Sequence, residues 1–327
     1  MALKLSYILP CYNVERYIAE CLDGIYAQDM PEEDFEVICV DDCSTDHTCL
    51  VIENRLQAHA NLKLIRHQRN MRVGIARNDG MKQAKGNYIC FVDADDMLPE
   101  GVMKKMCAVA IENDLDVLLY NNDVDVAGKL IEESVKYIDS TVVSGEEFIE
   151  KYLHGNIGKL GSPWAKLFKS SFLLQHSIWY SDLVYSEDSA FVWETMMCAN
   201  RVKSVSEVGY VYRVNDFSFS SDKKKPFVLF TSSVLYPEVL MDLLDKYEDR
   251  VPEMMRKGIV NEMETVVNGF GAEYLGYEEK GRREFHSMIR NHKMRFWKYL
   301  HRRQKLAYVF RKARFRTFNA VVEKLFA

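Results

Sequence analysis

Short apolar runs rich in β-branched and aromatic residues alternate with segments of helical spacing over the first 120 residues of this 327-residue chain. The apolar runs are 3–9, 35–40, 62–66, 88–92 and 117–120, and the helical segments between them are 14–28, 44–56, 76–84 and 99–113. This alternation predicts an α/β fold with a mainly parallel sheet and helices on both faces. In a sheet of this kind, ligands bind beyond the carboxyl ends of the strands.

Three carboxylates follow the fourth apolar run, at Asp93, Asp95 and Asp96. Negative charges at the end of a buried strand repel one another and resist desolvation, so they are most stable where a divalent cation neutralises them. The alternative is an acidic strand-to-helix turn in which Asp96 lies near the N-terminus of the next helix.

Polar residues also follow the first two apolar runs. Pro10, Tyr12 and Asn13 come after the first run, and Asp41 and Asp42 come after the second. Parallel strands would bring all these ends to one edge of the sheet, which predicts a crevice for a nucleotide and a metal ion. No glycine-rich phosphate-binding motif follows the first run, so a cation is expected to neutralise the diphosphate.

These segments occur in an order that is typical of a known family. They are Pro-Cys-Tyr-Asn at 10–13, Val-Asp-Asp-Cys-Ser-Thr-Asp at 40–46, Asn70 followed by Ala-Arg-Asn at 76–78, Gly80, Gly86, and Phe-Val-Asp-Ala-Asp-Asp at 91–96. Over roughly residues 3 to 220 the chain resembles the family 2 glycosyltransferases, which have the GT-A fold. The resemblance implies an inverting transferase that uses a nucleotide-activated sugar and a divalent cation, usually Mn²⁺ or Mg²⁺.

The resemblance also implies roles for individual residues. Those expected to bind the nucleotide sugar are Pro10, Tyr12, Asn13, Asp41, Asp42, Arg77, Asp93 and Ala94. Asp42 would accept a hydrogen bond from the base, most naturally uracil, while Asp93 would bind the ribose and Asp95 the metal. Arg77 would approach the base or the phosphates. One departure is that Arg72 stands where the family often has glycine.

The Tyr-Ser-Glu-Asp-Ser-Ala-Phe run at 185–191 resembles the family signature that supplies the catalytic base. Asp188 is therefore expected to accept the proton of the acceptor hydroxyl, with Glu187 as a supporting neighbour. An acidic helix N-terminus is the alternative. Trp164 and Lys166 resemble an element on the acceptor side, and the alternative is a core tryptophan beside a solvated lysine.

The rest of the chain predicts a second, helical region. A hairpin is expected over 123–137 around Gly128, a capping box at Ser144 before a helix to residue 153, and a strand over 210–214. The expected domains are a GT-A domain over 1–225, with a nucleotide-sugar half over 1–122 and an acceptor half over 123–225, and a C-terminal helical region over 226–327.

Charge is distributed unevenly along the chain. Its net charge is −5, but residues 290–327 hold twelve Lys or Arg against the single acid Glu323, interleaved with aromatic residues. This pattern predicts a basic amphipathic helix at an anionic membrane surface; the alternative is that the aromatic residues pack on the body of the protein. No nucleic-acid-binding motif accompanies the charge, so RNA binding is not expected.

The eight cysteines have no Cys-x-x-Cys spacing and are expected to be reduced, as in a cytosolic protein. A charged leader and an apolar run of about 20 residues are both lacking, so neither secretion nor a membrane-spanning helix is expected. Together with the basic tail, this predicts a peripheral position on the cytoplasmic face of the cell membrane.

These observations predict a hexosyltransferase that uses a UDP-sugar. Its expected acceptor is a hydroxyl of a glycan or polyprenyl-linked precursor of a surface polysaccharide such as a capsule. One alternative is a sugar-phosphate nucleotidyltransferase, which should carry a glycine-rich basic loop after its first strand, whereas residues 11–18 contain neither glycine nor lysine. Another is a non-catalytic protein that binds nucleotide sugars at the membrane.

Overall fold

The computed structural model describes residues 3–132, 136–152, 160–183, 186–215, 227–248, 251, 253 and 256–261. The chain divides into two compact units, Met1–Asp182 with Glu187–Asp222 and Leu183–Ser186 with Lys223–Ala327. In the second unit, helix α8 spans Phe227–Lys246, within the helical segment expected from the sequence. The basic tail at 290–327 lies outside the described residues, as does most of the expected helical segment beyond 261.

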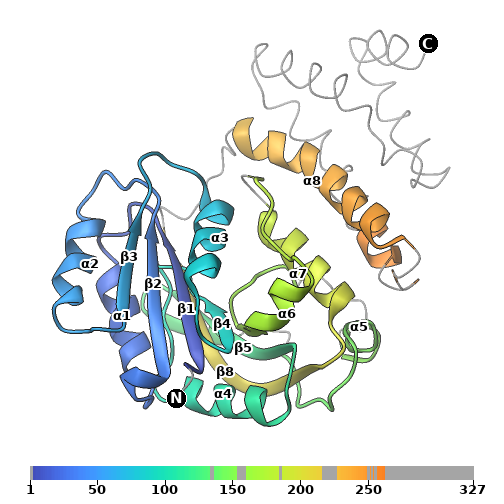
Figure 1. Cartoon of the computed structure of the whole chain (residues 1–327), viewed down its shortest axis with the longest axis horizontal. Coiled ribbons are helices and arrows are strands. Elements are labelled where there is room, and N and C mark those ends of the chain that lie inside the picture. Colours follow the sequence, from blue (N-terminus) through green and yellow to red (C-terminus); the bar gives the residue numbers. More distant parts are fainter. Residues whose placement is uncertain are drawn as a thin grey trace, which may run out of the picture. The chain divides into compact units, whose positions relative to one another are not determined.

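Four parallel strands form one half of the sheet in the first unit (Figure 1). They are β1 (Leu5–Cys11), β2 (Phe35–Asp41), β3 (Leu62–Arg66) and β4 (Tyr88–Phe91), in the spatial order β3-β2-β1-β4. The helices that follow them are α1 (Ile18–Tyr26), α2 (Thr48–Leu56), α3 (Val73–Gln83) and α4 (Val102–Glu112), with a short 3₁₀ turn η1 at Glu32–Asp34. The α/β class predicted from the sequence is confirmed.

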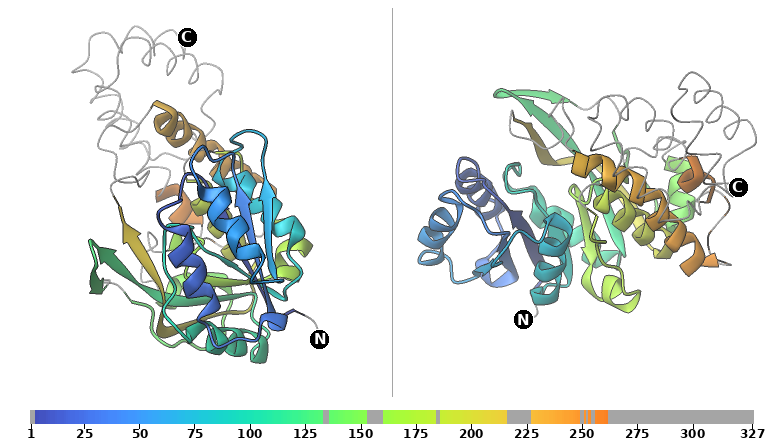
Figure 2. Two further views of the ribbon diagram at one scale, coloured as in Figure 1. Left: turned by 90° about the vertical axis from the view of Figure 1, so that its left-hand side faces the viewer. Right: turned by 90° about the horizontal axis from the view of Figure 1, so that it is seen from above.

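The other half of the sheet is mixed in direction. Strand β7 (Lys166–Lys169) runs antiparallel between β4 and β5 (Val117–Val126), and β6 (Lys129–Glu132) pairs antiparallel with β5. Strand β8 (Val202–Val214) pairs parallel with β5, so the β5–β6 hairpin and the end of β8 lie side by side (Figure 2). Helices α5 (Gly145–Tyr152), α6 (Ser170–Gln175) and α7 (Glu187–Cys198) complete this unit. Strand β5 is therefore not a neighbour of β4, although it follows β4 along the chain.

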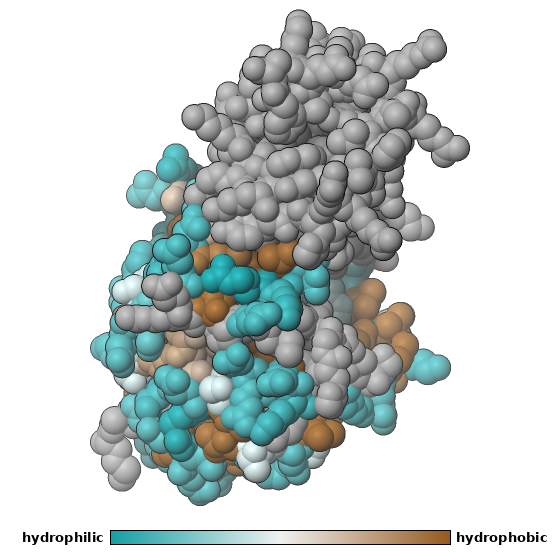
Figure 3. All heavy atoms as spheres, turned by 90° about the vertical axis from the view of Figure 1, so that its right-hand side faces the viewer, coloured by the Kyte–Doolittle hydropathy of each residue, from teal (hydrophilic) through white to brown (hydrophobic). Residues whose placement is uncertain are grey.

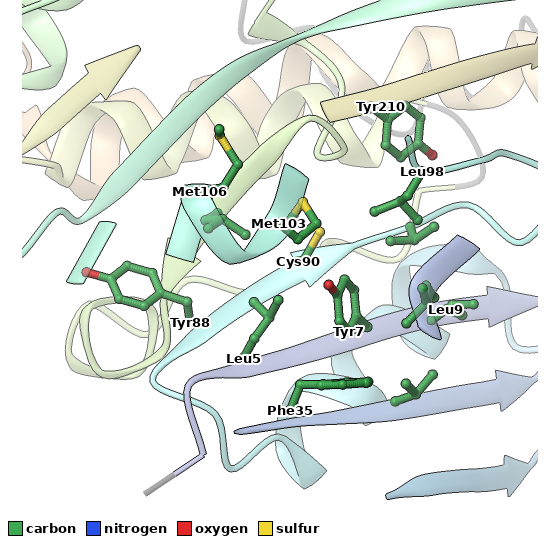
Figure 4. Close-up of a cluster of buried hydrophobic side chains, with 14 of the residues drawn as sticks. Leu5, Tyr7, Leu9, Phe35, Tyr88, Cys90, Leu98, Met103, Met106 and Tyr210 are labelled. Atoms are coloured by element: carbon green, nitrogen blue, oxygen red, sulfur yellow. The ribbon is translucent and has the colours of Figure 1, made fainter. Parts of the chain in front are cut away.

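The central strand β1 is covered by helices on both faces. Leu5, Tyr7 and Leu9 point to one side, where Met103 and Met106 of α4 lie (Figure 4). On the other side Ile8 contacts α3 so closely that a Cβ at Gly80 would overlap its Cγ2 atom. Burial on both faces explains why the strands read as continuous apolar runs.

Strand β1 continues through Pro10 to Cys11, whereas the sequence predicted that it would stop at Pro10. Pairing with β4 ends at Ile8, whose carbonyl accepts the Val92 N–H. Proline has no backbone N–H. An N–H at position 10 would point towards β4, as the Ile8 carbonyl does, but the pairing with β4 has already ended there. Proline at this position therefore removes no hydrogen bond of the sheet.

Helices α1 and α4 begin four and three residues later than predicted. Helix α1 begins at Ile18, and before it the N–H groups of Val14 and Glu15 donate to Thr48 Oγ1 at 2.8 Å and Asp46 Oδ2 at 3.1 Å. Helix α4 begins after Gly101, whose φ of 72° is left-handed and cannot belong to a right-handed helix.

The hairpin around Gly128 and the side-chain cap at Ser144 are confirmed. Ala127 and Gly128 both have positive φ, of 53° and 83°, as a two-residue hairpin turn of type I′ requires. Ser144 Oγ accepts the N–H of Glu147 at 3.2 Å, which caps α5.

The surface is mainly polar on the face that Figure 3 shows, where the described hydrophobic side chains form small separate groups. Within the part of the chain that the structure describes, no helix is both long and apolar enough to cross a membrane.

Candidate active site

The carboxyl ends of β1, β2 and β4 lie at the same edge of the sheet, as predicted, because the three strands are parallel. Asn13 joins the first two of these ends. Its Oδ1 accepts the N–H of Thr45 at 2.8 Å, and its own N–H donates to Ser44 Oγ at 3.0 Å. Next to Asn13, the Tyr12 side chain is 48% exposed and so presents an aromatic ring to solvent. Pro10 lies in β1, two residues before Tyr12.

Asp42, predicted to bind the base, is buried and organises the loop 67–72. One oxygen, Oδ1, accepts the Met71 N–H at 2.6 Å and lies 2.7 Å from His67 Nδ1, while Oδ2 accepts the Arg72 N–H at 2.7 Å. Since a carboxylate has about four acceptor positions, Oδ2 keeps capacity for one donor from a ligand. The neighbouring Asp41 is also buried, with Oδ2 accepting the Ser44 N–H at 3.1 Å.

Arg77 lies at the centre of the charged groups of this site. Its guanidinium is buried and donates from Nη2 to Asp93 Oδ1 at 2.8 Å and from Nη1 to Glu187 Oε1 at 2.9 Å. The same group lies 5.2 Å from the centroid of the Tyr180 ring. Burial lowers the pKa of Arg77, but the surrounding negative charges, first that of Asp93, raise it by more. The arginine therefore stays charged and links a strand-end carboxylate to the start of α7.

The three carboxylates after β4 have different environments. Asp96 is buried, accepts the Tyr210 hydroxyl at 2.5 Å and the Arg213 N–H at 2.8 Å, and has its pKa raised well above the usual value by burial and then by Asp93 and Asp95. Ala94 is buried beside it. Asp96 is thus a structural acceptor that the prediction of site residues did not include.

Asp93 and Asp95 retain more freedom to contact a ligand. The side chain of Asp93 is 27% exposed, and Asp95 Oδ2 accepts the Asn215 amide at 2.9 Å. Burial, followed by the charge of Asp93, raises the pKa of Asp95. A bound cation would reverse this effect, because it favours the charged carboxylate.

This donor set fits a divalent cation that is held mainly by its substrate. Among the described residues, no group of three or more His, Cys, Asp or Glu side chains is arranged to hold a metal ion. Mg²⁺ sites in phosphate-binding enzymes commonly use one or two carboxylates together with phosphate oxygens. Asp95 can supply such a carboxylate.

Glu187 and Asp188 begin helix α7, as predicted, so their charges face the positive end of the helix dipole. Burial, and secondarily the charge of Asp188, raises the pKa of Glu187 to about 7, although Arg77 opposes this rise. Burial also raises the pKa of Asp188, again against Arg77. Asp188 Oδ1 accepts the N–H of Ser189 at 2.7 Å. A carboxylate of raised pKa is a better proton acceptor near neutral pH.

Trp164 and Lys166 lie beside β8 and β5 respectively. The Trp164 ring stacks on Tyr210 with centroids 4.9 Å apart and on Tyr212 at 5.9 Å. Lys166 is buried and donates from Nζ to the Ser162 carbonyl at 2.6 Å, so the alternative of a solvated lysine is wrong. Its assignment to the acceptor side stays a prediction.

Sequence reasoning missed three residues that shape the site. His67 places Nδ1 against Asp42 and Nε2 3.1 Å from Asp79 Oδ2, and its position directly after the third strand was the available signal. Tyr210 binds both Asp96 and the Asp93 N–H, and Asn215 binds Asp95. The last two come from β8 and its end, more than 110 residues away, and no local pattern marks them.

Residues 6–154 match the model of the family described as glycosyl transferase family 2. The chain is 33% identical over 212 residues to poly(ribitol-phosphate) beta-N-acetylglucosaminyltransferase TarS of Staphylococcus aureus, a match that covers 64% of this chain and 35% of TarS. It is 32% identical over 221 residues to poly(ribitol-phosphate) beta-glucosyltransferase of Bacillus spizizenii, covering 65% of this chain and 32% of that protein. The chain thus spans about a third of the length of these curated relatives.

The fold is similar to that of a solved structure with a bound nucleotide. The crystal structure of S. aureus TarS 1–349 in complex with UDP has a TM-score of 0.66 and 27% identity, covering 88% of this chain and 79% of that one. The same fragment in complex with UDP-GlcNAc has a TM-score of 0.64. On the matching family model, these relatives and the similar fold, residues 6–154 form a glycosyl transferase family 2 domain, and the chain has the GT-A fold.

Proposed function

We propose that this protein transfers a sugar from a UDP-sugar to a hydroxyl of a surface-polymer precursor, with inversion at the anomeric carbon. The observation that carries the proposal is the buried Arg77, which binds Asp93 on the donor side and Glu187 beside the expected base. The Arg77 guanidinium thereby holds the expected donor-binding residue Asp93 close to Glu187, the neighbour of the expected base. The nucleotide complexes of the TarS structures support UDP as the nucleotide.

The donor side is assigned to the ends of β1, β2 and β4. Asp42 keeps acceptor capacity for the base, Tyr12 and Asn13 border the nucleotide, and Asp93 is accessible enough to accept a ribose hydroxyl. Asp95 would hold a divalent cation, which stabilises the charge that develops on the diphosphate as it leaves. The chain itself provides no glycine-rich phosphate loop for this purpose.

The acceptor side is assigned to the start of α7. Asp188 would take the proton of the acceptor hydroxyl while that oxygen attacks the anomeric carbon, opposite the leaving diphosphate. Glu187, held by Arg77, would keep α7 in place during this step. Trp164 and Lys166 are proposed to border the acceptor from the β7 side.

The acceptor is proposed to be a polyol-phosphate or related surface polysaccharide precursor, since the named relatives act on poly(ribitol phosphate). The basic tail at 290–327 would hold the enzyme at an anionic membrane surface where lipid-linked acceptors lie. This proposal includes a cytoplasmic, peripheral location.

The test is a screen of UDP-sugars for UDP release, with poly(ribitol phosphate) or a polyprenyl-linked glycan as acceptor and with Mn²⁺, Mg²⁺ or a chelator. We expect acceptor-dependent release with at least one donor, and its loss in the presence of the chelator. A sugar-phosphate nucleotidyltransferase would instead release pyrophosphate from a nucleoside triphosphate and a sugar phosphate. Binding of UDP-sugars without any turnover would favour the non-catalytic alternative.

A further inference from the structure

Arg72 has a backbone conformation that is essentially restricted to glycine. Its φ is 77° and its ψ is 157°, a region where a side chain strains the backbone. Two hydrogen bonds to Asp42, from the N–H groups of Met71 and Arg72, hold this conformation. Glycine at this position would avoid the strain, so the arginine side chain needs a separate explanation.

The side chain of Arg72 reaches a segment far away in the sequence. Its Nη1 donates to the carbonyl of Asp182 at 2.7 Å, five residues before the start of α7. Among the described residues, no carboxylate forms an ion pair with Arg72. A single hydrogen bond from an exposed guanidinium stabilises a fold only slightly, so stability alone does not account for the strained residue.

Helix α3 contacts the same segment at two further points and the first residue of α7 at a third. Asn78 donates to the Tyr180 carbonyl and accepts the Tyr180 N–H, both at 2.9 Å. A Cβ at Gly74 would lie 2.8 Å from the Ser181 carbonyl oxygen, so the two backbones approach closely there. Arg77 binds Glu187. Arg72 itself belongs to the loop 67–72 that Asp42 organises, so its hydrogen bond to Asp182 joins that loop to the segment.

We propose that Arg72 is a positioning residue that ties the nucleotide-side loop 67–72 to residues 180–182, which precede α7 in the sequence, and so helps to set Asp188 in register with the donor. This inference rests on the proposed function, because it assigns Asp42 to the nucleotide and Asp188 to the proton transfer. The donor contact assigned to this region comes from Asp42, which follows β2, and not from the Arg72 guanidinium, so loss of the guanidinium leaves nucleotide binding unchanged and slows the transfer step.

The experiment compares Arg72→Gly, Arg72→Ala and Arg72→Lys in the full chain. Both Gly and Ala remove the guanidinium, but only Gly relieves the backbone strain. We expect kcat to fall about tenfold or more in both, with the KM for the donor and the Kd for UDP within about twofold of wild type. Arg72→Gly should melt about 2 °C or more above Arg72→Ala, since the latter keeps the strain.

Arg72→Lys can still donate to the Asp182 carbonyl and should recover most of the lost kcat. Arg69→Ala is the matched control, because Arg69 lies in the same loop, and its Nε contacts Met71 Sδ at 3.2 Å. That variant should keep wild-type kcat.

Wild-type kcat in Arg72→Gly would overturn the inference. An equal rise of the donor KM and of the Kd for UDP in the same variant would also overturn it, because the guanidinium would then bind the donor itself. A higher Tm for Arg72→Ala than for Arg72→Gly would overturn the strain argument. If the wild-type protein neither binds nor turns over any UDP-sugar, the proposed function fails first, and the Tm order still tests the strain at this position.

Discussion

Arg77 Nη1 donates to Glu187 Oε1 at 2.9 Å across 110 residues of sequence, and both side chains are buried. The other end of the same guanidinium binds Asp93, so one charged group holds two carboxylates that belong to different parts of the fold. Breaking a buried ion pair by removing one partner costs about 3–5 kcal/mol, because the remaining charge is left uncompensated. This arrangement makes the site rigid and makes several variants informative.

Removal of Arg77 should unfold the protein more easily. We expect Arg77→Met to lower the free energy of unfolding by about 3 kcal/mol or more, since Asp93 and Glu187 lose their cation. The double variant Arg77→Met/Glu187→Gln should recover part of this loss without recovering activity. Denaturant unfolding of the single and double variants measures both effects, and equal stability of the two variants would contradict the coupling.

Asp188→Asn tests the proton acceptor. The amide keeps the size of the side chain but cannot take a proton, so we expect kcat to fall by about a hundredfold or more while UDP binding stays within about twofold. Asp23→Asn, at an exposed position of α1, is the control and should behave as wild type. Full transfer activity in Asp188→Asn would end the assignment.

The raised pKa of Glu187 predicts a pH dependence of stability. The pKa of Glu187 in the folded protein, about 7, lies above its ordinary value of 4.5. The protonated side chain therefore makes its full contribution to stability below pH 4.5, and this contribution is lost as the pH rises through about 7. Relative to Glu187→Gln, wild type should therefore lose stability between about pH 5 and pH 8. Melting curves across this range, with the exposed Glu112→Gln as control, test the sign; a gain for wild type would refute it.

Tyr210→Phe removes the hydroxyl that donates to Asp96 and accepts the Asp93 N–H. The buried Asp96 loses a donor, so we expect a loss of about 1–3 kcal/mol in the free energy of unfolding. Tyr7→Phe is a matched control, because the Tyr7 hydroxyl is buried and has no hydrogen-bond partner among the residues that the structure describes, so its removal should be neutral or stabilising. Similar losses in both variants would contradict this reasoning.

Asp95→Asn tests the proposed cation site. In wild type, Mn²⁺ or Mg²⁺ should strengthen UDP binding measured by calorimetry, because the cation neutralises the diphosphate beside Asp93 and Asp95. In Asp95→Asn this strengthening should fall by about tenfold, while binding of uridine, which has no phosphate, stays the same. An equal metal effect in both proteins would place the cation elsewhere.

The sequence by itself determined the elements of the nucleotide-side half and the polar groups at its strand ends, because hydrophobic periodicity and turn residues act over a few neighbouring positions. β3 has the predicted bounds, and Asp42, Asp93 and Asp188 lie at the predicted strand and helix ends. The direction of β7 was not predictable, since its pairing with β4 and β5 depends on the whole sheet.

Only the tertiary structure decided which of these groups touch. The contacts Arg77–Glu187 and Arg72–Asp182 each join residues 110 positions apart, and Tyr210–Asp96 joins residues 114 positions apart. Such pairs have no local signature, because they form only when β8 has joined the sheet and α3 and α7 pack on it. Local sequence therefore supplied the chemistry of the site, and packing between distant segments supplied its geometry, burial and pKa shifts.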